Sequence, residues 1–466
     1  MKKINTSPIS GAQELLPESQ LIFDNLKTKI AKVYKQHGYY NIETPCIERS
    51  EILFAKAGGD TEKQIYEVKK TGDKATPNST QALRFDHTVP LARYVIEHEN
   101  DLNFPFKVAQ IGLNFRGERA QKGRFREFYQ CDIDIIGREK LPLAYDADVI
   151  STLLHAFAIF DLDTPVLARI SNRKILTGLL ESLDLQAKTS EISNIIDHAE
   201  KVTPEQTKVS LEELKLDKYQ VKTILNLIAL SGARSEVITK LENLEIKNAT
   251  FEQGVAELDQ VLGLLETIGL QDQISADLAI IRGLDYYTGT VFEFILPEHK
   301  NIGSVAGGGR YDNLTNYFSD KLFPGVGGSI GLTRLFYVLS EHNLINSSSQ
   351  NLTEYALIPV SEAENEYAFK LADELRTKHH STTIVLTDKK LGDKLSYAAK
   401  IAANGIVIGD EEIKTGQLKV KDFATGKTRD FSFVAESITE SDNAQSTPTT
   451  DPTDFWTDPS EPSTFL

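Results

Sequence analysis

The chain has 466 residues, of which 40% are hydrophobic and 25% charged, a balance typical of a folded protein with about two to four domains. No apolar run is long enough to cross a membrane, and the two N-terminal lysines precede no apolar stretch, so we expect neither a membrane span nor a signal peptide. A net charge of −16 argues against indiscriminate binding to nucleic-acid backbones. The two cysteines, Cys46 and Cys131, cannot form a disulfide framework, which favours a cytoplasmic location.

The N-terminal part of the chain predicts helices and a long hairpin. Apolar residues at helical spacing predict a helix over 20–38, and a strand-like segment follows it and ends at Pro45. Polar and apolar side chains alternate over 106–116 and 124–137, which predicts two strands joined by the loop GERAQKG. Another helix is predicted over 142–161.

The remaining chain changes character twice. From about residue 175 to 270, Lys, Glu, Leu and Ile at helical spacing predict a helical insertion without strands. Strand patterns return at 279 and lead into a glycine-rich segment and a helix at about 331–342. After the polar linker NLINSSSQNLTE, strands and helices alternate over 355–434, as in a small separate α/β domain.

Residues 436–466 form a segment rich in Ser, Thr, Pro and Asp that carries acids but no Lys or Arg. Such a composition cannot bury enough apolar surface to fold, so we predict a disordered acidic tail. The tail holds the only tryptophan, Trp456, and a short docking motif is the alternative to an idle chain end.

The predicted hairpin has one polar face. Side chains that alternate along a strand share a face, and here that face carries Gln110, Asn114, Arg116, Arg124, Arg126, Phe128, Gln130, Asp132 and Asp134. The residues between them are mostly apolar and would face a core. Exposure to solvent would be enough to explain a polar face. Arginines at the loop end and acids farther in could, however, also hold a phosphate and an amine.

Three later segments carry unusual glycines, arginines and tyrosines: IIRGLDYYTGTVFEF at 280–294, SVAGGGRYDNL at 304–314 and GVGGSIGLTRLF at 325–336. None forms a strand–GxGxxG–helix unit or a GxxxxGK[ST] loop, so Rossmann and P-loop folds are excluded. Taken singly, the tyrosines could be ordinary strand packing and the arginines solvent-facing.

Together the motifs resemble class II aminoacyl-tRNA synthetases, and specifically the histidyl-tRNA synthetase family. The segment ending at Pro45 is similar to motif 1, FRGERAQKGRFREF (115–128) to motif 2 and GVGGSIGLTRLF to motif 3. RGLDYYTGTVFE (282–293) and AGGGRYD (306–312) resemble the histidine-specific segments, and SGAQELLP and ISNRKIL also look like this family. The resemblance covers about 1–435.

The resemblance implies an α+β fold. Residues 1–174 and 271–345 would form the class II catalytic core, a mainly antiparallel sheet flanked by helices. The helical insertion at 175–270 would contact the tRNA acceptor stem, residues 353–435 would form an α/β anticodon-binding domain, and 436–466 would be the disordered tail. Motif 1 implies a homodimer, and no membrane partner is expected.

The implied reaction has two steps. L-histidine and ATP, with Mg²⁺, would form histidyl-adenylate and release pyrophosphate, and histidine would then move to the 3′ end of tRNA(His). No prosthetic group is implied, and no side chain is predicted as a metal ligand. Arg282 and Arg116 would be the catalytic residues, with Arg116 on the α-phosphate, Glu118 on the adenine, Arg334 on the γ-phosphate and Arg124 near the nucleotide.

Other residues would hold the amino acid and the tRNA. The histidine-binding residues implied by the resemblance are Asp86, Thr88, Gln130, Asp134, Arg282, Tyr286, Tyr287 and Tyr311. The carboxylates and the amide would hold the α-amine, and the tyrosines would read the imidazole. Arg119 and Gln121, in the motif 2 loop, would lie near the acceptor end.

Some positions depart from the family pattern, and two other functions compete with the ligase. Thr333 stands where motif 3 usually has Glu, Asp86 is a shorter acid than usual, and SGA at 10–12 replaces RGT. The main alternative is the non-catalytic, histidine-binding regulatory subunit of ATP phosphoribosyltransferase, and the second is an RNA-binding sensor. The intact motif 2 and motif 3 arginines and the domain-like pattern at 355–434 favour the ligase.

Overall fold

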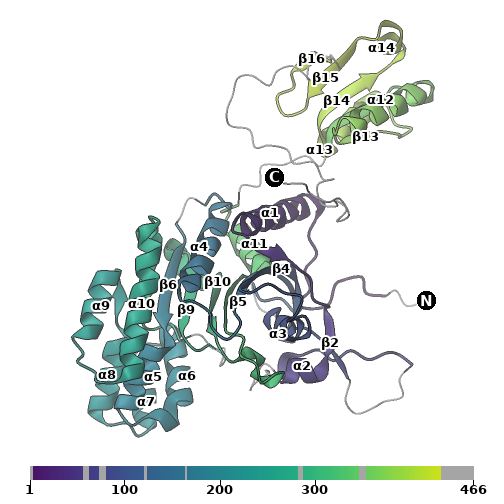
Figure 1. Cartoon of the computed structure of the whole chain (residues 1–466). Helices are drawn as coiled ribbons and strands as arrows, with labels where there is room; N and C mark the ends of the chain where they lie inside the picture. Colours follow the sequence, from purple (N-terminus) through teal and green to yellow (C-terminus); the bar gives the residue numbers. More distant parts are fainter. Residues whose placement is uncertain are drawn as a thin grey trace, which may run out of the picture. The chain divides into compact units, whose positions relative to one another are not determined.

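The computed structural model describes residues 4–55, 62–72, 80–119, 123–162, 165–281, 287–345 and 353–431. The predicted tail at 436–466 lies outside the described residues. The chain divides into two compact units, residues 1–348 and 349–466, and each unit is described by itself (Figure 1).

The first unit is built on a nine-stranded sheet with the order β1-β4-β5-β11-β10-β9-β6-β8-β7. Its strands are β1 (Tyr40–Asn41), β4 (Phe106–Phe115), β5 (Glu127–Ile136), β6 (Leu167–Asn172), β7 (Ser231–Gly232), β8 (Ile274–Asp277), β9 (Thr290–Ile295), β10 (Ala306–Tyr311) and β11 (Gly325–Ile330). The central strands pair antiparallel, while β1–β4 and β6–β8 pair parallel. A separate two-stranded sheet joins β2 (Ile47–Arg49) to β3 (Gln81–Leu83).

Helices outside the insertion cover the sheet and frame its loops. They are α1 (Pro17–Gln36), α2 (Ser50–Phe54), α3 (Thr88–Glu97), α4 (Ala144–Ala158) and α11 (Leu332–Glu341), with the short helices η1 (Glu62–Gln64), η4 (Gln271–Gln273), η5 (Pro297–Ile302) and η6 (Leu314–Tyr317). The alternation predicted for the hairpin is confirmed, because Cys131, Ile133 and Ile135 of β5 are fully buried against the helices. In the same core, Tyr34 of α1 donates its hydroxyl to the Cys131 carbonyl at 3.0 Å. The opposite face of β4 and β5 is therefore left for polar side chains.

The insertion consists of helices packed on the edge of the sheet. They are α5 (Arg173–Ser182), η2 (Gln186–Lys188), α6 (Thr189–His198), η3 (Ala199–Lys201), α7 (Pro204–Glu213), α8 (Lys218–Ile228), α9 (Arg234–Glu242) and α10 (Ala249–Thr267). The expectation that it has no strand is wrong at one point, because β7 pairs with the end of β8. Two residues carry no period-2 pattern, so the sequence gives no signal for β7. Arg169 of β6 holds Asp277 at 2.9 Å and also pairs with Glu200 of η3, which ties the insertion to the sheet.

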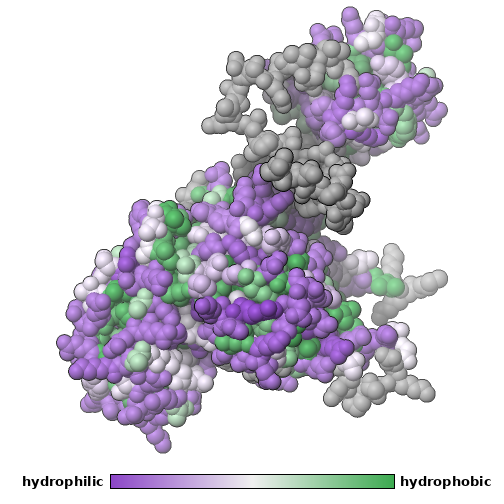
Figure 2. Space-filling model, in the orientation of Figure 1, coloured by the Kyte–Doolittle hydropathy of each residue, from purple (hydrophilic) through white to green (hydrophobic). Residues whose placement is uncertain are grey.

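The second unit is a small α/β domain. Its sheet has the order β13-β12-β14-β15-β16, with β12 parallel to both of its neighbours. The elements are β12 (Thr353–Pro359), η7 (Glu362–Glu364), α12 (Asn365–Thr377), β13 (Thr382–Ile384), α13 (Leu391–Ile401), β14 (Ala402–Ile408), α14 (Asp410–Thr415), β15 (Leu418–Asp422) and β16 (Thr428–Phe431). Hydrophilic side chains dominate the visible face of each unit (Figure 2). Every helix in the described part of the chain is too short or too polar to span a bilayer.

Candidate active site

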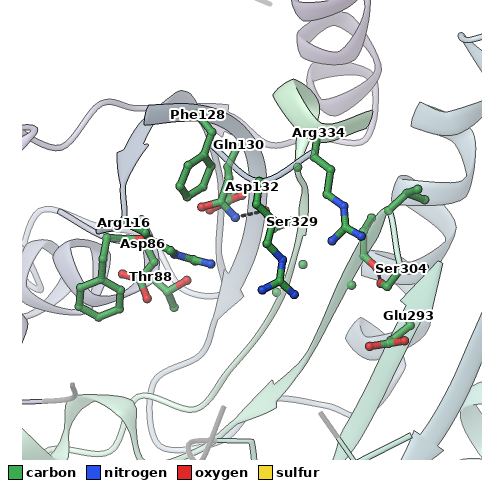
Figure 3. Close-up of a pocket in the computed structure, with 18 of the residues that line it drawn as sticks. Asp86, Thr88, Arg116, Phe128, Gln130, Asp132, Glu293, Ser304, Ser329 and Arg334 are labelled. Atoms are coloured by element: carbon green, nitrogen blue, oxygen red, sulfur yellow. Dashed lines mark hydrogen bonds between the residues drawn. The ribbon is translucent and has the colours of Figure 1, made fainter. Parts of the chain in front are cut away.

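A cavity of about 520 Å³ opens on the polar face of the first unit's sheet. Its walls come from β5 and the loop that joins it to β4, the start of α3, the strands β9 to β11 and the start of α11 (Figure 3). The structure brings ten of the predicted site residues to this cavity: Asp86, Thr88, Arg116, Glu118, Arg124, Gln130, Asp134, Tyr287, Tyr311 and Arg334. Arg282, Tyr286 and Gln121 lie outside the described residues, and Arg119 is described but does not line the cavity.

Asp134 and Tyr311 form the floor of one end. The Tyr311 hydroxyl donates to Asp134 Oδ1 at 2.6 Å, and both side chains are buried. The neighbouring strand makes room for this pair because Gly327 lies opposite Asp134 in the register. A Cβ on Gly327 would lie 1.9 Å from Asp134 Oδ1, and one on Gly325 would lie 2.3 Å from the Tyr311 ring. The glycines of motif 3 therefore serve close packing at this end of the cavity.

Asp86 stands at the start of α3 beside this floor. Its Oδ1 accepts the backbone N–H of Val89 at 3.1 Å, as a residue at a helix N-terminus commonly does. Burial raises the pKa of Asp86 to about 6, against the opposing charge of Arg116. Burial also raises the pKa of Asp134 to about 8, with Asp132 and Asp86 adding to the shift. This end of the cavity thus holds several buried carboxyl groups that a bound cation would stabilise in their charged form.

A row of amides and hydroxyls links the strands at the middle of the cavity. Gln130 Nε2 donates to Ser329 Oγ at 2.7 Å, and the amides of Gln130 and Asn114 are bonded at 2.7 Å. The two bonds fix the orientation of Gln130 toward the cavity (Figure 3). Thr333, at the unusual motif 3 position, accepts the backbone N–H of Tyr129 at 2.8 Å and so joins α11 to β5.

Arginines lie on two sides of the cavity, Arg116 beside Asp86 and Arg334 across from it (Figure 3). Arg116 donates from Nε to the Phe85 carbonyl at 3.0 Å, and its guanidinium lies 5.2 Å from the ring centre of Phe128. Glu118 lies between two cations, 4.0 Å from Arg116 and 3.5 Å from Arg124. The planar forks of such arginines suit phosphate oxygens, which accept paired charge-assisted hydrogen bonds.

Arg334 reaches the cavity from the first turn of α11. Its Nη2 donates to the Ile302 carbonyl at 2.8 Å, which orients the guanidinium over the strands. Glu293 and Ser304 line the same side of the cavity (Figure 3). The cavity therefore combines arginines that can bind an anion with carboxyl groups that can bind an amine.

Sequence reasoning missed several lining residues, among them Asp132, Glu293, Ser329 and Asp197 of the insertion. Asp132 was visible on the polar face of the hairpin, but alternation alone could not rank it above its neighbours. Asp197 had no signal, because only the folded insertion brings it to the cavity. Arg310, beside Tyr311 in the glycine-rich motif, points away from the cavity.

Residues 11–335 match the family model for histidyl-tRNA synthetase, and residues 354–439 match the anticodon binding domain. A histidine–tRNA ligase of Clostridium tetani is 43% identical over 438 residues, which cover 93% of this chain and 98% of that protein. One from Clostridium acetobutylicum is 41% identical over 430 residues, covering 92% and 98%.

Comparison with solved structures also finds histidyl-tRNA synthetases. The crystal structure of histidyl-tRNA synthetase from Nostoc sp. PCC 7120 is similar with a TM-score of 0.82 at 34% identity, covering 92% of this chain and 97% of that one. The structure of an ATP phosphoribosyltransferase regulatory subunit/histidyl-tRNA synthetase from Bacillus halodurans C has a TM-score of 0.70 at 22% identity, covering 85% and 97%, which shows a shared fold alone.

Proposed function

The chain belongs to the histidyl-tRNA synthetase family, and on that premise we propose how its cavity carries out the ligase reaction. The family match confirms the predicted class II synthetase fold with a C-terminal anticodon-binding domain. The activity is that of a histidine–tRNA ligase, which activates L-histidine with ATP and transfers it to tRNA(His). The matches favour the ligase over the regulatory-subunit alternative, whose likeness is limited to the fold.

The observation that carries the proposal is that one cavity combines buried carboxyl groups with arginines. Asp86 and Asp134 line it, Arg116 lies beside Asp86, and Arg334 lies on the opposite side (Figure 3). L-histidine with its α-ammonium at the carboxyl groups would direct its carboxylate toward an ATP whose phosphates contact the arginines. The two reactants would then meet in the middle of the cavity, beside Gln130.

We assign the chemistry to positioning and charge. The histidine carboxylate attacks the α-phosphorus, the bond to the pyrophosphate breaks, and pyrophosphate leaves with the electron pair. Holding both reactants in line makes the step effectively unimolecular, and Arg116 offsets the negative charge that develops on the α-phosphate. Arg282, which lies outside the described residues, would act beside it between carboxylate and phosphate; its support is the motif RGLDYYTGTVFE.

The side chains at the edges of the cavity would set specificity. Tyr287 and Tyr311 would read the imidazole, together with Tyr286 of the motif outside the described residues. A pocket built to hydrogen-bond a side chain rejects analogues that leave its buried polar groups unpaired. Glu118 would read the adenine edge, and Arg119 with Gln121 would contact the acceptor end during transfer of histidine to the ribose hydroxyl.

The family implies ATP and a divalent metal ion, and we propose that the metal is Mg²⁺ brought in with the nucleotide. Among the described residues, no group of three His, Cys, Asp or Glu side chains could hold a metal without the substrate. Glu293 lines the Arg334 side of the cavity and fits a supporting role, since Mg²⁺ commonly combines one or two carboxylates with substrate phosphates. The ion would neutralise phosphate charge.

The remaining expectations concern the domains and the assembly. We propose that residues 1–174 and 271–345 form the catalytic core, that the insertion at 175–270 contacts the acceptor stem, and that 353–435 binds the anticodon. We also propose a cytoplasmic homodimer formed through motif 1. The predicted symmetric contact can be checked by the mass of the protein in solution.

Histidine-dependent exchange of radiolabelled pyrophosphate into ATP tests the proposed first step. We expect exchange with L-histidine and none without it. Arg116→Ala should lower the rate by about 10²- to 10³-fold, the loss typical of removing one charge-stabilising group. No exchange from folded wild-type protein that still binds histidine would contradict the proposal and favour a regulatory role.

A further inference from the structure

Asp132 is a buried carboxylate for which the proposed mechanism has no use. It lies on β5 between Gln130 and Asp134, is 4% exposed, and lines the cavity (Figure 3). Its Oδ2 is hydrogen-bonded to His87 Nδ1 at 2.9 Å. Its Oδ1 is buried and has no hydrogen-bond partner among the described residues.

A buried carboxylate with a hydrogen-bond partner on only one oxygen destabilises the folded protein. Removing an ionised carboxylate from water is expensive unless a charge or several donors compensate it. Asp86 and Asp134 add to the cost, because both lie close enough to Asp132 to interact with it electrostatically. Because Asp132 lines the cavity, the oxygen without a partner points to a ligand that carries a cation and N–H donors.

His87 holds Asp132 in place. Its ring is 1% exposed, and with Nδ1 protonated it donates a hydrogen bond to the Asp132 carboxylate. Gly112 of β4 leaves space for the ring: a Cβ there would lie 3.3 Å from His87 Nε2 and 2.8 Å from Arg84 Nη2. Arg84 is itself fixed, since its Nε donates to the Leu113 carbonyl at 2.9 Å. The His87 ring is thus buried beside Asp132, with Gly112 and Arg84 as close neighbours.

We propose that Asp132 binds the α-ammonium of L-histidine, as a third carboxylate beside Asp86 and Asp134, and that His87 is its positioning residue. The inference rests on the proposed function, because it concerns the same amino-acid site. The α-ammonium is the chosen group because it is mostly protonated at neutral pH and then carries a charge and three donors, whereas the imidazole is largely neutral there. Three carboxylates bind an ammonium group more favourably than a neutral ring.

The test separates recognition of the amine from general damage to the site. L-Histidinol keeps the α-ammonium and lacks the carboxylate, while imidazolepropionate keeps the carboxylate and lacks the α-ammonium. Both serve as competitive inhibitors of histidine-dependent pyrophosphate exchange. In Asp132→Asn, an isosteric change, we expect the inhibition constant for histidinol and the KM for histidine to rise at least about tenfold. The inhibition constant for imidazolepropionate should stay within about twofold.

Equal rises of both inhibition constants would overturn the inference, as would no change in either. The wild-type protein distinguishes the two proposals. If it catalyses no pyrophosphate exchange, the proposed function is wrong; if it does, the inhibition constants of the variants test the role of Asp132. Asp101→Asn, which removes an exposed carboxylate outside the cavity, is the matched control and should leave all constants unchanged.

The positioning role of His87 has its own readout. His87→Leu, like Asp132→Asn, should raise the inhibition constant for histidinol and leave that for imidazolepropionate nearly unchanged. If His87 acts through Asp132, the double variant should bind histidinol no worse than Asp132→Asn alone. Multiplicative losses in the double variant would contradict the positioning role, and circular dichroism with thermal melting confirms that each variant is folded.

Discussion

Replacing Gly327 by alanine should weaken binding of L-histidine while changing the binding of ATP little. A Cβ at this position would lie 1.9 Å from Asp134 Oδ1, 2.6 Å from its Cγ and 2.8 Å from the Ile133 carbonyl. Non-bonded carbon and oxygen atoms need about 3 Å or more, so the carboxylate must move by about 1 Å. That movement breaks the 2.6 Å hydrogen bond from Tyr311.

The size of the effect follows from the bond that is lost. A hydrogen bond to a charged group contributes about 1.5 to 3 kcal/mol, which corresponds to an increase of about 10- to 160-fold in the KM for L-histidine. The same crowding should lower the free energy of unfolding by about 1 to 3 kcal/mol. The KM for ATP should change by less than about threefold, because the three atoms nearest to the added Cβ belong to Asp134 and Ile133 and not to a phosphate-binding arginine.

Pyrophosphate exchange at varied histidine and varied ATP measures both constants, and urea denaturation measures stability. Gly392→Ala is the matched control, since nothing lies within 4 Å of a Cβ at that position in α13. An unchanged KM for histidine in folded Gly327→Ala would refute the placement of Asp134 in the amino-acid site.

Three further predictions concern stability. Arg310 and Asp146 form a buried ion pair at 2.7 Å. Arg310→Met leaves the Asp146 carboxylate buried without its partner, so it should lower the free energy of unfolding, measured by urea denaturation, by about 3 to 5 kcal/mol. Adding Asp146→Leu should restore most of that stability. Burial raises the pKa of Asp86 to about 6 and that of Asp134 to about 8, above their unfolded values, so the stability of ligand-free protein should fall as the pH rises from about 4 to 8. The slope should reach at most about 1.4 kcal/mol per pH unit for each carboxyl, and Asp134→Asn should flatten it above pH 6. Thr333→Val removes the hydroxyl that accepts a 2.8 Å hydrogen bond from the backbone N–H of Tyr129 in β5. It should lower the free energy of unfolding by about 1 kcal/mol, and an unchanged denaturation midpoint would contradict this.

The hairpin could be predicted because it depends on local periodicity. Alternation placed strands over 106–116 and 124–137, and the structure has them at Phe106–Phe115 and Glu127–Ile136. The second strand starts later than predicted because the backbone N–H of Arg126 donates to the Gly11 carbonyl at 2.7 Å. A contact with a residue more than a hundred positions away leaves no trace in strand periodicity.

Side-chain partners across the fold could not be predicted for the same reason. Arg310 follows three glycines in a motif of the family, yet it pairs with Asp146 of α4 on the helical side of the sheet. His87 and Asp132 are bonded although neither had a distinguishing pattern. Composition and spacing identify which residue types are present on a face, whereas tertiary packing decides which of them meet.

The most direct test of the central claim is the charging of tRNA(His) by the purified protein with radiolabelled L-histidine. We predict that label appears on the tRNA 3′ end only when ATP is present, and that Arg334→Ala slows this charging together with pyrophosphate exchange. Folded protein that binds both histidine and ATP but transfers no histidine to tRNA(His) would contradict the account.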